Sequence, residues 1–92
     1  MKEKQMITEF LDRCFDGFDE ITYTVRASGR KVAKNLAFEI VVKDRVDRYR
    51  IMKYVYYNPE YDTFYILFLG KWFVTDERRF ILSILSCCLI PF

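Results

Sequence analysis

Apolar residues recur at spacings of three and four in the first part of the chain, and charged residues fill the positions between them. This spacing places the apolar side chains on one stripe of a helix. The pattern therefore predicts an amphipathic helix over residues 3–16. Gly17 is expected to end it, because glycine readily adopts the left-handed conformation that closes many helices. The stripe consists of Met6, Ile7, Phe10, Leu11, Cys14, Phe15 and Phe18.

The pattern then changes to an alternation of apolar and polar residues. Residues 21–27 alternate and are rich in β-branched side chains, which predicts a strand with one buried face. Residues 28–30 carry a turn signal. Residues 31–36 fit either a continuing strand or a short helical turn. A second strand is predicted over residues 37–43, where Phe38, Ile40 and Val42 share one face.

Two further runs with high β-propensity, residues 48–57 and 63–73, flank a loop at residues 58–62. Pro59 at the second loop position favours a type I turn, and the Asn58 side chain can accept a hydrogen bond from the backbone two residues later. These features predict an antiparallel hairpin.

A second helix is predicted over residues 76–89. The hydroxyl of Thr75 and the carboxylates of Asp76 and Glu77 suit a helix N-terminus, and Pro91 is expected to end the helix. Because connections this short favour antiparallel neighbours, the sequence predicts one α+β domain over residues 1–92. Its order is α-β-β-β-β-α, a four-stranded antiparallel meander with an N-terminal and a C-terminal helix.

Both faces of the predicted hairpin are apolar, so its two strands need cover on both sides. Either one helix covers each face, or both helices pack on one face and the other face meets a second copy or another protein. The first face carries Tyr49, Ile51, Val55, Tyr57, Phe64, Ile66 and Phe68. The opposite face carries Met52, Tyr54, Tyr56, Tyr65, Leu67 and Leu69.

Aromatic residues make up 18% of the chain, and they are concentrated in residues 49–73. Tyrosine suits an interface because its ring buries well while its hydroxyl seeks a polar partner. The face that contains Met52 and Leu69 is therefore predicted to be a protein-binding or dimer face. The alternative is that these aromatic residues form the core of a small domain.

The net charge of +2 conceals a segregation of charge along the chain. Residues 1–20 are acidic overall, and residues 21–53 are strongly basic. This basic surface could be solvated or ion-paired, could contact an acidic protein, or could bind a single-stranded nucleic acid through cations and stacked rings. Its members are Arg26, Arg30, Lys31, Lys34, Lys43, Arg45, Arg48, Arg50 and Lys53.

Catalytic chemistry is not predicted. The chain has no histidine, which excludes imidazole bases and ligands, and it contains no phosphate-binding or metal-ligand motif, so no catalytic residue, cofactor or metal is expected. The odd number of cysteines does not suit a disulfide framework, and Cys87 and Cys88 are interpreted as small apolar helix residues. No secretory signal or spanning segment is predicted, which favours a cytoplasmic protein without membrane contact.

Two functional hypotheses follow. The first is a small non-catalytic protein-binding domain, expected to be a homodimer, that acts as an inhibitor or adaptor by occupying a surface on a larger assembly. Inhibitors encoded by phages or other mobile elements fit this size and composition. The alternative is a nucleic-acid-binding module that uses residues 26–53 together with the hairpin tyrosines.

Overall fold

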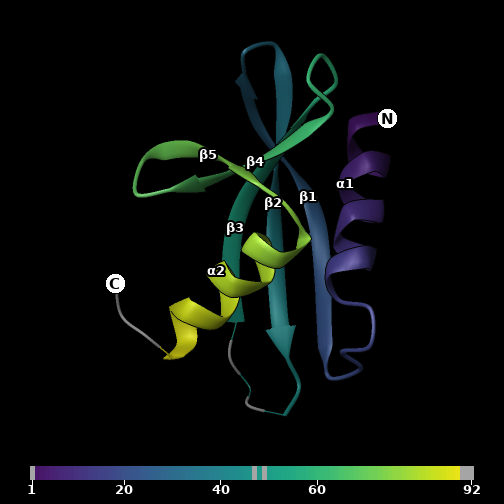
Figure 1. Cartoon of the computed structure of the whole chain (residues 1–92), viewed down its shortest axis with the longest axis vertical. Helices are drawn as coiled ribbons and strands as arrows, with labels where there is room; N and C mark the ends of the chain where they lie inside the picture. The colour runs from purple at the N-terminus through teal and green to yellow at the C-terminus, as the bar shows by residue number, and fades with distance from the viewer. Residues whose placement is uncertain (1, 47, 49, 90–92) are drawn as a thin grey trace.

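The computed structural model describes residues 2–46, 48 and 50–89, with the backbone alone for residues 85–89. The elements follow the order α1 (Lys2–Cys14), β1 (Ile21–Val32), β2 (Asn35–Asp44), β3 (Arg50–Asn58), β4 (Thr63–Phe68), β5 (Lys71–Thr75) and α2 (Glu77–Leu89). The strands form one antiparallel sheet in the order β1-β2-β3-β4-β5 (Figure 1). The predicted α+β class and terminal helices are confirmed, whereas the sheet has five strands and not four.

The extra strand arises because the predicted strand over residues 63–73 is divided by a tight turn. Leu69 and Gly70 have φ angles of 51° and 79°, and Phe68 pairs with Lys71 on either side of them. Two consecutive residues with positive φ form the type of two-residue turn whose twist suits a hairpin. The polypeptide therefore reverses inside an otherwise apolar run.

The β1–β2 connection also lies later than predicted. At residues 28–30 the structure has an irregularity within β1: Gly29 has a φ of 79°, and the register shifts between Ala27 and Lys31. The reversal itself occurs at Ala33 and Lys34, both of which have positive φ. The ambiguous residues 31–36 thus form the end of β1, the turn and the start of β2.

The predicted β3–β4 loop is confirmed. The Asn58 side-chain oxygen accepts a hydrogen bond from the Glu60 backbone N–H at 2.9 Å. The Tyr57 hydroxyl donates to Asp62 Oδ1 at 2.6 Å, which ties the end of β3 to the end of the loop. The pairing of Tyr56 with Tyr65 fixes the register of the hairpin.

Helix α2 begins one residue later than predicted. Asp76 caps it, because its Oδ1 accepts a hydrogen bond from the Arg79 backbone N–H at 2.8 Å. The Thr75 hydroxyl donates instead to the Asp76 carbonyl oxygen at 3.4 Å. The expected stop at Pro91 lies outside the described residues. No helix in the described part of the chain is long and apolar enough to cross a membrane.

Both helices pack on the same face of the sheet, which is the second of the two arrangements that the sequence allows. Phe10 of α1 stacks on Phe64 of β4 and contacts Phe80 of α2 edge to face, with ring centroids 4.3 and 5.7 Å apart. Arg13 Nε lies 3.2 Å from Glu77 Oε1 and joins the two helices near the solvent. The buried core consists of Ile7, Phe10, Leu11, Cys14, Phe15, Phe38, Ile40, Val42, Val55, Tyr57, Phe64, Ile66, Phe80 and Ile84.

Candidate functional site: the helix-free face of the sheet

The face of the sheet that points away from both helices is the candidate site, and we call it the open face. Side chains alternate between the two faces along each strand, so the register assigns them once the core residues are known. The described helix side chains that are buried all belong to the core on the other face. The open face carries Thr22, Thr24, Arg26, Ala37, Glu39, Val41, Lys43, Arg50, Met52, Tyr54, Tyr56, Tyr65, Leu67, Trp72 and Val74.

The half of the open face over β3, β4 and β5 is aromatic. Tyr56 and Tyr65 are cross-strand neighbours whose rings stack at 4.7 Å with an angle of 8° between their planes. Trp72 of β5 contacts Tyr56 edge to face at 4.8 Å. Burial, followed by the neighbouring Tyr65, raises the pKa of the Tyr56 hydroxyl. These contacts make a continuous aromatic layer across three strands.

This aromatic layer is only partly exposed. Tyr56 is 6% exposed because the rings beside it cover it, whereas Met52 and Val74 are each 50% exposed. Tyr54, Tyr65, Leu67 and Trp72 are intermediate. The prediction placed five of these residues on one face, and the register confirms that they share it: Met52, Tyr54, Tyr56, Tyr65 and Leu67.

The half of the open face over β1, β2 and β3 is basic. Arg26, Lys43 and Arg50 are exposed on it, and Glu39 forms an ion pair with Arg26. The Arg30 guanidinium lies over the Tyr54 ring at 5.7 Å from its centroid, an arrangement in which the cation is attracted to the ring. The open face therefore combines an aromatic half with a half of net positive charge.

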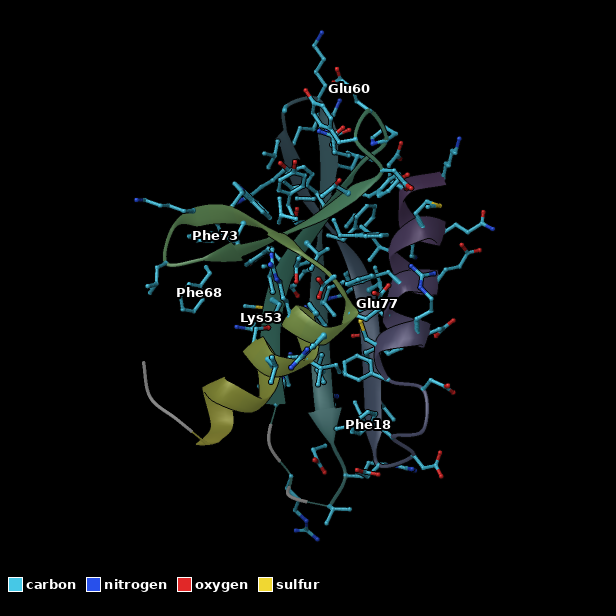
Figure 2. All side chains as sticks on the ribbon, in the orientation of Figure 1. Phe18, Lys53, Glu60, Phe68, Phe73 and Glu77 are labelled. Atoms are coloured by element: carbon cyan, nitrogen blue, oxygen red, sulfur yellow. The ribbon has the colours of Figure 1, made fainter. Side chains whose placement is uncertain are left out.

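Several residues of the predicted sites lie elsewhere. Leu69 is not on the open face, because it belongs to the β4–β5 turn. Lys53 is not part of a basic surface: it shares the helix-covered face with Ile51 and Val55 and is 8% exposed. Its Nζ lies 5.9 Å from the centroid of the Phe68 ring, and Figure 2 labels both residues.

The remaining predicted cations occupy the two ends of β2. Lys31 and Lys34 lie at the β1–β2 turn, while Arg45 and Arg48 follow β2 at its other end. Arg45 is tied to the loop before β1, because its backbone N–H donates to the Glu20 carbonyl oxygen at 2.9 Å and its side chain donates to the Asp19 carbonyl oxygen at 2.5 Å. The nine cations thus do not form one patch.

A second surface was not predicted from the sequence. On the helix-covered side, β5 and α2 border a groove of about 400 Å³. Phe73 and Leu82, each 49% exposed, contribute to its walls together with Phe68. Figure 2 shows Phe68 and Phe73 on the β4–β5 hairpin, which extends away from α1. The sequence did not predict this groove because residues 63–73 were interpreted as one continuous strand, without the β4–β5 turn.

Cys14, the cysteine whose side chain the structure describes, is buried and forms no disulfide. Burial, followed by the nearby Glu77 carboxylate, raises the pKa of the Cys14 thiol to about 12, so the thiol stays protonated near neutral pH. Within the described residues, no group of three potential metal ligands converges on one point. The side chains of Cys87 and Cys88 lie outside the described residues.

The open face has the features of a surface that binds another macromolecule. A broad sheet with partly exposed aromatic rings, apolar side chains and a flanking charged region has the composition of many protein interfaces. Comparison with family models, with curated proteins and with solved structures finds no match to this chain.

Proposed function

We propose that this chain is a small non-catalytic binding domain that recognises another protein through its open face. The observation that carries the proposal is the packing of both helices on one face of the sheet, which leaves the aromatic half without a helix. A domain of this kind acts as an inhibitor or adaptor by occupying a surface on its partner.

The anchor residues for such a contact are the partly exposed apolar and aromatic side chains. Aromatic residues and arginine contribute most to binding where they become fully desolvated. Met52 stands half-exposed beside the aromatic layer, and Tyr54 is held under Arg30. Covering them would remove apolar surface from water without a large rearrangement of their neighbours.

Nucleic-acid binding is the second candidate function, because Arg26, Lys43 and Arg50 share the open face with the tyrosines. Cations that contact phosphate and rings that stack on bases are the elements of single-strand recognition. The ring geometry favours the protein partner, however. Tyr56 and Tyr65 cover one face of each other, and the Tyr54 ring already lies beneath a guanidinium.

The two candidates respond in opposite ways to added positive charge. In the double variant Met52→Lys/Tyr65→Lys, new ammonium groups on the open face should weaken an apolar protein contact and strengthen phosphate binding. The matched control is Tyr61→Lys/Val46→Lys, which adds the same charge at exposed positions outside the strands.

The experiment compares wild type and both variants in capture from a lysate of the source cells, and in binding to poly(U), oligo(dT) and duplex DNA at low and high salt. The proposal predicts proteins that are captured by wild type and the control but not by the open-face variant. Tighter binding of the open-face variant to poly(U), with no change in captured protein, would overturn the proposal in favour of the nucleic-acid function.

A further inference from the structure

Strand β5 forms one edge of the sheet, and its outer side carries unpaired backbone groups. It hydrogen-bonds to β4 alone in the described part of the chain. Phe68 and Lys71 close the two-residue turn, so they form a hydrogen-bonded pair. Hydrogen-bonded and non-hydrogen-bonded pairs then alternate along the two strands, and Trp72 and Val74 fall in non-hydrogen-bonded pairs with β4. The backbone N–H and C=O groups of Trp72 and Val74 are therefore directed away from β4.

The two edges of the sheet differ in their protection. Exposed edges in natural proteins are usually blunted by charges, prolines or bulges. Strand β1 has such features, because its register shifts between Ala27 and Lys31 and it carries Arg26 and Arg30. The Trp72-Phe73-Val74 segment of β5 has no charge, proline or bulge, and Phe73 and Val74 are half-exposed.

From these features we infer that β5 pairs with β5 of a second copy of the chain and extends the sheet across a two-fold axis. An antiparallel pair centred on Phe73 uses all five residues of the strand. Trp72 of one copy then lies opposite Val74 of the other, and these are the residues whose outward backbone groups need partners. The pairing would form four backbone hydrogen bonds around the axis.

The side chains of this pair are self-complementary. On the open face, Trp72 meets Val74, so two apolar side chains lie opposite each other on either side of the axis. On the helix-covered face, the two Phe73 rings meet at the mouths of the grooves that Phe68 and Leu82 line. Apolar cross-strand pairs of this kind stabilise a sheet.

Charge also favours a second copy at this edge. Lys71 lies opposite Thr75 in the proposed register, and Asp76 and Glu77 follow Thr75 at the start of α2. The ammonium group of one copy therefore approaches the exposed Asp76 carboxylate of the other, while Glu77 stays paired with Arg13 of its own copy.

The proposed dimer does not depend on what binds the open face, but it would enlarge that face. Both copies contribute their open faces to the same side of a continuous sheet, and their aromatic halves meet at the axis. The homodimer expected from the sequence is thus assigned to the β5 edge.

Two measurements on the wild-type chain test the pairing. Sedimentation equilibrium should show a monomer–dimer equilibrium between about 20 µM and about 1 mM. Hydrogen exchange followed by NMR should slow at least about tenfold at the Trp72 and Val74 amides as the dimer forms. The Phe73 amide, which is bonded to β4, should be protected at both concentrations and serves as the internal control.

A matched pair of variants at Val74 separates backbone pairing from side-chain contact. Val74→Pro removes an outward N–H without touching the β4 pairing, and should weaken the dimer roughly ten- to a hundredfold. Val74→Thr keeps the N–H and a similar shape and should retain the dimer. Circular dichroism confirms that both variants remain folded.

These measurements test the β5 pairing without testing the proposed function of the open face. A chain that stays monomeric at about 1 mM overturns the pairing, as does a dimer in which the Trp72 and Val74 amides exchange freely. Either result leaves the recognition of a partner by the open face unaffected.

Discussion

Replacing Phe80 with alanine tests whether α2 covers the sheet as the structure shows. Phe80 belongs to α2 and is fully buried. Its side chain is part of the core that the two helices form with the sheet. Its ring meets Phe10 at 5.7 Å and Phe15 at 6.2 Å, both in edge-to-face arrangements. The substitution removes these contacts and leaves a cavity in the core where α2 packs against α1.

The expected cost follows from this full burial. Truncating a buried phenylalanine to alanine typically lowers the free energy of unfolding by about 3–5 kcal/mol, which combines lost transfer energy with the cavity. Domains of this size have a total stability of only about 5–14 kcal/mol. Phe80→Ala should therefore be severely destabilised, and Phe80→Leu, which refills most of the space, should lose roughly 1–2 kcal/mol.

Urea unfolding followed by circular dichroism measures both losses. With a slope near 1 kcal/mol per molar urea for a chain this short, Phe80→Ala should shift the midpoint by about 3–5 M or fail to fold. The matched control is Leu82→Ala on the same helix, where the side chain is 49% exposed. It should cost less than about 1 kcal/mol.

A different pair of results would refute the reasoning. If Phe80→Ala and Leu82→Ala shift the midpoint equally, α2 does not bury Phe80 in solution. The helix would then not cover this face, and the contrast between a covered face and an open face would fail.

Three further predictions concern the turn, a tyrosine and the buried thiol. Leu69→Asn should raise the stability by about 0.5–1 kcal/mol in urea unfolding, because Leu69 has a φ of 51° and Asn-Gly is the preferred sequence for this turn; a loss would contradict the turn assignment. Burial and the Asp12 carboxylate, which accepts a hydrogen bond from the Tyr23 hydroxyl, raise the Tyr23 pKa from 10.0 to about 12. The stability that this bond contributes is present below pH 10 and is lost as the pH rises towards 12, so Tyr23→Phe should flatten the decline of stability measured over that range. Native Cys14 should resist alkylation at neutral pH and react after unfolding, as peptide mass spectrometry can show.

Much of the fold follows from local pattern. The three-and-four spacing around Phe10 determines α1, and the alternation of Phe38, Ile40 and Val42 determines the buried face of β2. The Asn58-Pro59 loop carries its own turn chemistry, as its hydrogen bond shows. These elements were predictable because each is encoded by neighbouring residues.

The sequence pattern does not predict the separate strand β5, because the turn before it contains an apolar residue. The β4–β5 turn has Leu69 at a position where asparagine or aspartate is usual, so the hydrophobic run continues through the reversal. Gly70 was the available signal, since an isolated glycine in a strand pattern often marks a break. The bulge at Gly29 was mistaken for a turn because glycine favours both.

The candidate site could be predicted only in part. Alternation along β3 and β4 groups Met52, Tyr54 and Tyr65 on one face. Which face the helices cover depends on how two amphipathic stripes pack together over the sheet, and no residue pattern within one element determines that. The same packing explains why Lys53, which lies on the helix-covered face, is buried although its charge suggested a surface position.

Site-specific photo-crosslinking in the source cells tests the central claim, that the open face recognises a protein, most directly. A photoreactive amino acid replaces Met52 on the open face, and in a matched variant it replaces Tyr61, which is exposed in the β3–β4 loop. The claim predicts a defined protein adduct from position 52 and none from position 61. Equal protein adducts from both positions, or adducts from position 52 with nucleic acid alone, would contradict it.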